Sequence, residues 1–290
     1  MLWFRVGYFQ TDVKGDLNKL NNASLFNALH FILYSQKFLT MIKIGLIGGS
    51  GLEKLNIFKD VKEIQVETPY GFPSSTFLTD TIGMCEVYIL SRHGRDHSIP
   101  PTQVNNRANI AALKQLGCQY IFATTACGSL REDIRRGDVI IADQFIDFTR
   151  HRINTFYDKF EQGQVVHTAM ADPFSEKLRL LLIEGCKETG ISFHPTGTIV
   201  TIEGPRFSTR AESRIFRLLG ADVINMSIAP EASLAMEAGI PYAAIALSTD
   251  YDSWKHDEEP VTWDDILRVF NENVKHVTGL LVHILMTFNE

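Results

Sequence analysis

Two carboxylates, Asp250 and Asp252, stand on either side of Tyr251, directly after the apolar stretch Tyr242–Leu247. In an extended chain, residues i and i+2 point to the same side, so both carboxylates can face one ligand. Such a pair suits general acid catalysis or the coordination of a metal ion. Because no third acidic or histidine ligand follows at a recognisable spacing, we favour proton transfer over metal binding.

A second polar cluster, RHGRDH at residues 92–97, follows another apolar stretch. An arginine can hold a phosphate-like anion through two parallel hydrogen bonds, and a histidine can donate a further one. We therefore predict that Arg92 and His93 bind an anion. Arg95 and Asp96 are expected only to satisfy neighbouring polar groups.

Three further segments offer hydroxyl groups and small residues that suit an anion, namely Gly48–Gly51, Thr124–Ser129 and Asn225–Ser227. The glycine loop fits neither a dinucleotide fingerprint nor a P-loop, because the spacing of both motifs fails. Cys127 has no assignable histidine base, so we predict packing and not covalent catalysis. Ser129 fits an S-x-x-E capping box, so we expect its role to be structural.

The elements that must position these clusters are short apolar strands that alternate with amphipathic helices, and Gly117, Gly190, Gly220 and Gly239 each follow a helix as its expected end. This alternation predicts an α/β fold with a central mixed, largely parallel sheet flanked by helices. Parallel sheets bind ligands beyond the carboxyl ends of their strands, which is where the polar clusters fall. The expected strands are Ile42–Ile47, Glu86–Leu90, Tyr120–Thr125, Val139–Ala142, Thr198–Ile202, Asp222–Met226 and Tyr242–Leu247. The expected helices are Val104–Leu116, Ser175–Thr189, Thr209–Leu219, Pro230–Ala238 and Trp263–Met286.

The composition excludes some classes of function. The chain has 290 residues and a net charge of −6, which argues against nucleic acid as a partner. Its four cysteines form no C-x-x-C pair, as expected for reduced thiols in a cytoplasmic protein. No uninterrupted apolar run approaches the ~18 residues that span a bilayer, so we expect no membrane partner.

The first forty residues differ from the rest of the chain, because their apolar stretch is patchy and Met41 directly precedes a strong strand pattern. We expect residues 1–40 to be a peripheral extension, or to lie upstream of a true start at Met41. Residues 41–290 are expected to form a single catalytic domain.

Several long motifs resemble the purine nucleoside phosphorylase and methylthioadenosine phosphorylase family, with the closer likeness on the methylthioadenosine side. The resemblance runs from about Ile42 to the last helix and is highly specific. It implies an α/β phosphorylase fold, a homotrimer or a hexamer built from trimers, and neither a metal nor an organic cofactor. The motifs are Ile44–Leu52, Ala123–Glu132, Thr201–Ser213, Ala221–Glu231 and Thr249–Lys255.

The resemblance also implies roles for individual residues. Met226 would contact the ribose, while Asp250 and Asp252 would bind adenine, with Asp250 as the acid at N7 and Asp252 as its support. Inorganic phosphate, as co-substrate, would attack the sugar and release adenine and 5-methylthioribose 1-phosphate. The implied phosphate ligands are Ser50, Arg92, His93, Thr125, Ala126 and Ser227.

Substrate choice rests on three positions. Relatives that prefer 6-oxopurines carry Glu at position 208 and Asn at position 250, so Ser208 with Asp250 favours adenine. Trp263 stands where many methylthio-specific relatives carry a small apolar residue, so adenosine is a second expected substrate. The alternatives left open are a broader purine nucleoside phosphorylase, a phosphate-independent nucleosidase and, from another class, a non-catalytic nucleotide-binding or redox module.

Overall fold

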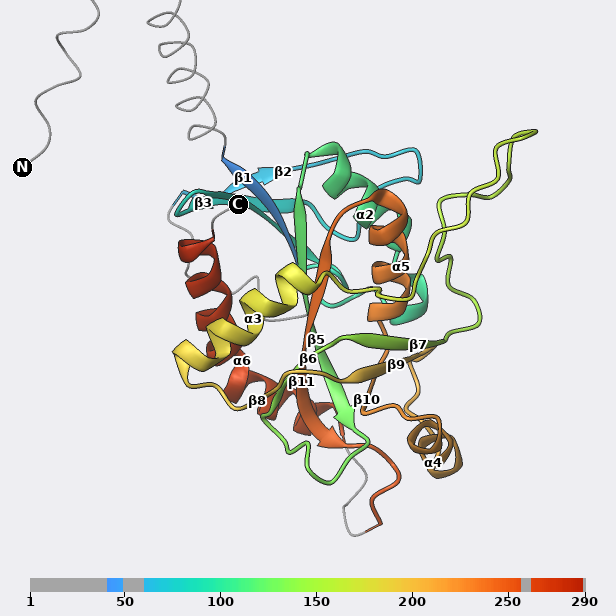
Figure 1. Ribbon diagram of the computed structural model, residues 1–290, viewed down its shortest axis with the longest axis vertical. Coiled ribbons are helices and arrows are strands. Elements are labelled where there is room, and N and C mark those ends of the chain that lie inside the picture. Colours follow the sequence, from blue (N-terminus) through green and yellow to red (C-terminus); the bar gives the residue numbers. More distant parts are fainter. Residues whose placement is uncertain (1–40, 49–59, 257–261, 289–290) are drawn as a thin grey trace, which may run out of the picture. The chain divides into compact units, whose positions relative to one another are not determined.

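The computed structural model describes residues 41–48, 60–256 and 262–288 of the chain (Figure 1). The predicted boundary at Met41 stays a prediction, because residues 1–40 lie outside the described part. None of the helices in these described ranges has the length and hydrophobicity of a membrane span.

The core of the described chain is one mixed sheet of eleven strands (Figure 1). Of its ten strand pairings in the described residues, six are parallel and four antiparallel, which confirms the predicted mixed, largely parallel sheet. The strands are β1 (Ile42–Gly48), β2 (Lys62–Ile64), β3 (Phe77–Ile82), β4 (Cys85–Ser91), β5 (Tyr120–Ser129), β6 (Val139–Ile141), β7 (Gln144–Phe148), β8 (Phe193–His194), β9 (Thr198–Ile202), β10 (Val223–Asn225) and β11 (Tyr242–Tyr251).

Several helices begin at capping side chains and end at glycines. Thr209 and Glu212 form a capping box at the start of α4, and Gly190 and Gly239 close α3 and α5 with left-handed φ angles of 69° and 71°. The capping box suggested at Ser129 does not form, because Ser129 ends β5, and its hydroxyl instead bonds with the backbone of Arg131. The helices are α2 (Asn106–Gln115), α3 (Glu176–Thr189), α4 (Arg210–Leu218), α5 (Ile228–Ala238) and α6 (Trp263–Thr287), with a short 3₁₀ turn η3 (Pro101–Gln103).

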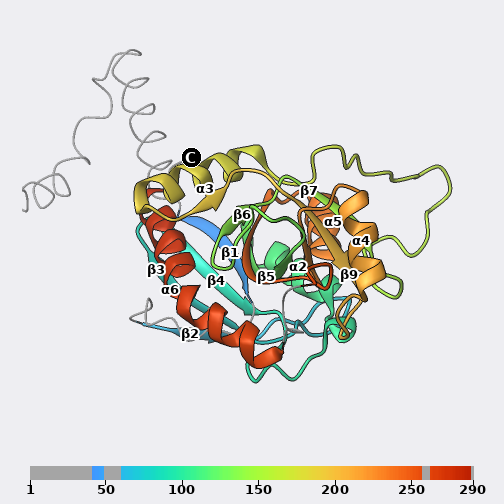
Figure 2. The same cartoon turned by 90° about the horizontal axis from the view of Figure 1, so that it is seen from below.

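Helices cover both faces of the sheet, as Figure 2 shows. The helices α2 and α5 bury residues such as Leu113 and Leu234 in one apolar cluster. The helices α3 and α6 bury Leu182 and Leu281 in a second cluster. Each leucine fully removed from water contributes about 1.5–3 kcal/mol, so these contacts fix the sheet as a rigid platform for its strand ends.

Two central strands run further than their apolar residues predict. β5 continues to Ser129 and β11 to Tyr251, because their polar ends pair with each other in parallel register. A register shift between Ser248 and Asp250 re-aims the end of β11, as a bulge does. Residues 126–129 and 248–251, which lie beyond the predicted ends of these two strands, are therefore part of them.

Candidate active site

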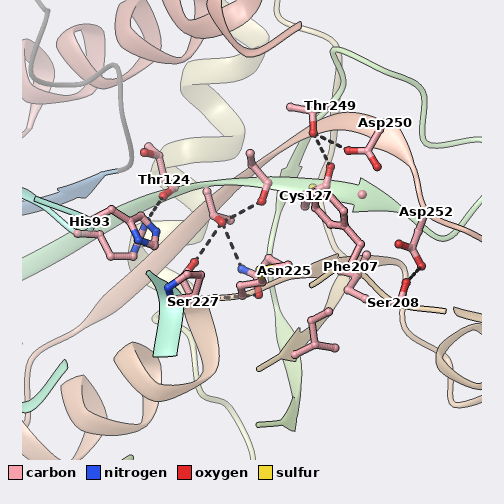
Figure 3. A pocket seen from close by; sticks show the side chains of 18 of the residues that line it. His93, Thr124, Cys127, Phe207, Ser208, Asn225, Ser227, Thr249, Asp250 and Asp252 are labelled. Carbon is pink, nitrogen blue, oxygen red and sulfur yellow. Dashed lines mark hydrogen bonds between the residues drawn. The ribbon is translucent and has the colours of Figure 1, made fainter. Parts of the chain in front are cut away.

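One pocket of about 180 Å³ lies where the ends of β5, β10 and β11 meet. Figure 3 shows His93 at one end of this pocket and the two carboxylates Asp250 and Asp252 at the other. It is lined by Arg92, His93, His97, Pro101, Thr124, Thr125, Ala126, Cys127, Gly128, Ile202, Phe207, Ser208, Ile224, Asn225, Met226, Ser227, Thr249, Asp250 and Asp252.

Arg92 follows β4 and is held by a buried ion pair. Its Nε and Nη2 atoms donate to the two carboxylate oxygens of Glu231, at 2.5 and 3.0 Å, and Nη1 donates to the carbonyl of Thr124 at 2.9 Å. The side chains of Arg92 and Glu231 are 2% and 0% exposed. Burial alone would lower the pKa of Arg92, but the charge of Glu231 outweighs it and raises that pKa, so the guanidinium stays charged. Two of its five N–H groups are left for a ligand.

His93 lies beside Arg92 and lines the pocket. Its Nδ1 atom bonds with the carbonyl of Ile99 at 2.9 Å, and its ring stacks at a tilt on His97, with ring centres 4.7 Å apart. His97 has a positive φ angle of 53°, which turns the chain back towards His93. Burial and the charge of Arg92 lower the pKa of His93 to about 4, so its imidazole is neutral near pH 7.

Beside His93, a group of neutral hydroxyl and amide side chains completes the anion end of the pocket. The hydroxyls of Thr125 and Ser227 lie 3.2 Å apart, and Asn225 donates to Thr125 at 3.3 Å (Figure 3). Asn225 is fixed in turn by the hydroxyl of Thr201, at 2.8 Å. These donors come from β5, β9 and the end of β10, and they suit the oxygens of an anion.

The carboxylate end combines β11 with the segment before α4. Thr249 donates to Oδ1 of Asp250 at 2.7 Å, and Ser208 donates to Oδ2 of Asp252 at 2.5 Å. Burial raises the pKa of Asp252, although the hydrogen bonds from Ser208 and its neighbours oppose the rise. A Cβ at Gly128 would lie 3.2 Å from Asp250 and 3.4 Å from Asp252, so the glycine gives both carboxylates their room.

Met226 also lines the pocket, and two neighbouring residues fix its position. Arg152, whose side chain is 2% exposed, donates to the Met226 carbonyl at 3.0 Å and pairs with Glu203 at 2.9 Å. Gly204 packs under the Met226 side chain so closely that a Cβ there would lie 2.4 Å from the sulfur. No cluster of three or more candidate metal ligands occurs in the described residues.

The structure thus brings most of the predicted site residues into one pocket, and their individual roles stay predictions. Ser50 lies outside the described residues, and Trp263 begins α6 with its side chain outside them. Arg95 bonds with Glu63 and Thr76 and is not a pocket residue, as expected. The predicted pocket residues present are Arg92, His93, Thr125, Ala126, Ser208, Met226, Ser227, Asp250 and Asp252.

Sequence reasoning missed several pocket residues and their supports. Phe207 stands next to Ser208, so the GPRFS motif that contains both was an available signal. Glu231 ends the Ala221–Glu231 motif, but its pairing with Arg92 gave no signal, because the two residues lie 139 positions apart.

The chain belongs to the phosphorylase superfamily, whose sequence profile matches residues 43–286. Within that superfamily it is a nucleoside phosphorylase, that is, a pentosyltransferase. The S-methyl-5′-thioadenosine phosphorylase of Danio rerio is 51% identical over 243 residues, which cover 83% of this chain and 87% of that protein. The enzyme of the same name from Xenopus tropicalis is 52% identical over 244 residues, with the same coverage of 83% and 87%.

Solved structures agree with these sequence relatives. The methylthioadenosine phosphorylase of Schistosoma mansoni in complex with adenine has a TM-score of 0.80 and 44% identity, covering 84% of this chain and 91% of that one. A mutant of the adenosine/methylthioadenosine phosphorylase from the same organism, in complex with methylthioadenosine, has a TM-score of 0.79 and 44% identity, covering 84% and 90%.

Proposed function

We propose that this protein cleaves 5′-methylthioadenosine with inorganic phosphate, giving adenine and 5-methylthioribose 1-phosphate. The observation that carries this proposal is the polarity of the pocket, with anion donors at one end and the buried carboxylates at the other. The S-methyl-5′-thioadenosine phosphorylases of Danio rerio and Xenopus tropicalis, which are 51% and 52% identical to this chain, support the same reaction.

In the proposed reaction, an oxygen of phosphate forms the bond to C1′ as the C1′–N9 bond breaks and its electron pair passes to the base. A proton from Asp250 reaches N7, so adenine leaves as a neutral molecule and the carboxylate stays behind. Asp252 and Ser208 support the 6-amino side of the base. The phosphate held beside Arg92, His93 and Ser227 stabilises the cation-like sugar and is aligned to attack it.

Adenosine is the second proposed substrate, because the Schistosoma relatives include an adenosine/methylthioadenosine phosphorylase. The test is a comparison of methylthioadenosine, adenosine and inosine as substrates, followed by chromatography of the free bases. We expect efficient release of adenine from the first two and at least ~100-fold slower release of hypoxanthine. Equal turnover of inosine would contradict the adenine assignment.

We propose further that the reaction needs no metal or organic cofactor, because the donors present are N–H, hydroxyl and carboxyl groups suited to phosphate and a base. Dialysis against a chelator should then leave the rate unchanged. A rate that falls on chelation and returns on addition of a divalent cation would contradict this proposal.

The proposed assembly is a homotrimer, or a hexamer built from two trimers, in the cytoplasm. Exposed apolar side chains support an interface between copies, among them Ile153, Phe160 and Val165, which are 52%, 47% and 64% exposed. The four cysteines are all buried and free, in keeping with a reducing compartment. Light scattering should give three or six times the monomer mass of 32.7 kDa, and a monomer or a dimer would contradict the assembly.

A further inference from the structure

The hydrogen bond of His93 fixes which of its ring nitrogens carries a proton. Nδ1 lies 2.9 Å from the carbonyl oxygen of Ile99. A carbonyl can only accept, so Nδ1 is the donor, and in the neutral ring Nε2 then carries a lone pair. His93 lines the anion end of the pocket, so it offers a ligand a hydrogen-bond acceptor and not the donor expected from the sequence.

The surroundings of His93 oppose its protonation. Burial is the largest cause that lowers the pKa of His93, and the charges of Arg92, His97 and Arg152 lower it as well. The bond to Ile99 acts in the other direction but is outweighed, and the resulting pKa is about 4.

The cations around this end are balanced by carboxylates. Arg92 pairs with Glu231, which also accepts from the hydroxyl of Tyr242 at 2.9 Å. Arg152 pairs with Glu203 at 2.9 Å. Among the described residues, this subsite therefore holds its anion mostly by directed hydrogen bonds.

We propose that the phosphate subsite selects tetrahedral oxyanions that still carry a proton, with Nε2 of His93 accepting the hydrogen bond of that P–OH group. The proposal rests on the phosphorolytic function proposed above and specifies the form of its co-substrate. Inorganic phosphate carries at least one P–OH group near neutral pH. Sulfate has the same shape and no proton, so its oxygen would face the lone pair of Nε2 unless His93 first took up a proton.

The test is competitive inhibition by sulfate in the wild-type enzyme, measured against phosphate from about pH 6.5 to 8.5. If sulfate needs one added proton on His93, its inhibition constant rises about tenfold per pH unit, or roughly 100-fold over the range. The KM for phosphate changes by less than about threefold over the same range, because phosphate brings its own proton.

Two variants assign the effect to one ring. In His93→Gln the side-chain amide can donate at any pH, so the sulfate constant becomes nearly independent of pH. In His97→Asn, chosen because asparagine tolerates the positive φ angle of that residue, the pH dependence persists.

A wild-type sulfate constant that is flat with pH would overturn the proposal, as would a pH dependence that survives in His93→Gln. The wild-type series decides the matter alone if a variant does not fold. Adenine release that needs no phosphate is a different result, and it would overturn the proposed function itself.

Discussion

Ser208 donates a hydrogen bond of 2.5 Å to Asp252, and both side chains line the base end of the pocket. The serine oxygen faces a carboxylate from a segment 44 residues away, at the end of β11. A hydroxyl here leaves Asp252 available to the 6-amino group of adenine, whereas a glutamate would compete with it for the same donors. The pair therefore links base selection to Asp252 as well as to Asp250.

Exchange of the selecting residues should change the preferred base. In the double variant Ser208→Glu with Asp250→Asn, the glutamate can accept from N1–H of hypoxanthine, a hydrogen that adenine lacks. We expect the ratio of kcat/KM for inosine to that for adenosine to rise at least ~10-fold. Steady-state kinetics with both nucleosides measures it, with each single variant as control. An equal fall in kcat/KM for inosine and for adenosine would contradict the base-selecting role.

The buried carboxylate of Asp252 should lower the stability of the folded protein at neutral pH. Its pKa is raised in the folded state by burial, so folding favours its protonated form, and that contribution is lost as pH rises through the folded pKa. Asp252→Asn removes the buried charge and keeps an acceptor for Ser208. We expect its Tm at neutral pH to rise by about 2–4 °C, and the gain to vanish in acid. Thermal melts across pH check this, and a lower Tm at neutral pH would contradict it.

Tyr242 should act on phosphate through Glu231 and Arg92. In Tyr242→Phe the carboxylate loses a donor at 2.9 Å, and the guanidinium that it orients is held less firmly. We expect the KM for phosphate to rise about 3–10-fold and the KM for the nucleoside to stay within about twofold. Tyr88→Phe, a buried tyrosine on β4 outside the pocket residues, is the matched control. Equal changes in both KM values would indicate a general structural effect instead.

Gly204 should be needed for nucleoside binding, because the side chain of Met226 packs directly against it. A Cβ there would lie 2.4 Å from the sulfur of Met226, whereas at Gly190, with a similar φ of 69° against 66°, nothing lies within 4 Å. Both alanine variants share the cost of a left-handed backbone, about 1 kcal/mol. Only Gly204→Ala should displace Met226 and raise the nucleoside KM, by about tenfold. Nucleoside KM values for the two variants measure this, and a shared value would refute the positioning role of Gly204.

The sequence predicted the helices and the sheet type well because these depend on local patterns. Gly190 and Gly239 mark helix ends by backbone conformation alone, and both predictions are confirmed. The predicted ends of β5 and β11 were too early, because these strands continue to Ser129 and Tyr251. Polar residues stay in a strand when a partner strand pairs with them. That pairing joins segments far apart in the sequence, so runs of apolar residues do not reveal it.

The candidate site was predictable as a set of residues and less so as a set of interactions. Strand ends bring together Arg92, Ser227 and Asp250, as the topology of a parallel sheet requires. The direction of the His93 hydrogen bond depends on Ile99, and the support of Arg92 depends on the distant Glu231. Neither contact could be predicted from the spacing of residues in the sequence.

The measurement that tests the central claim most directly is the release of adenine from 5′-methylthioadenosine with and without inorganic phosphate. The pocket, with its anion donors facing its carboxylates, predicts release only when phosphate is present, together with one equivalent of 5-methylthioribose 1-phosphate. Release at full rate without phosphate, with free methylthioribose as the second product, would contradict a phosphorylase and indicate a nucleosidase.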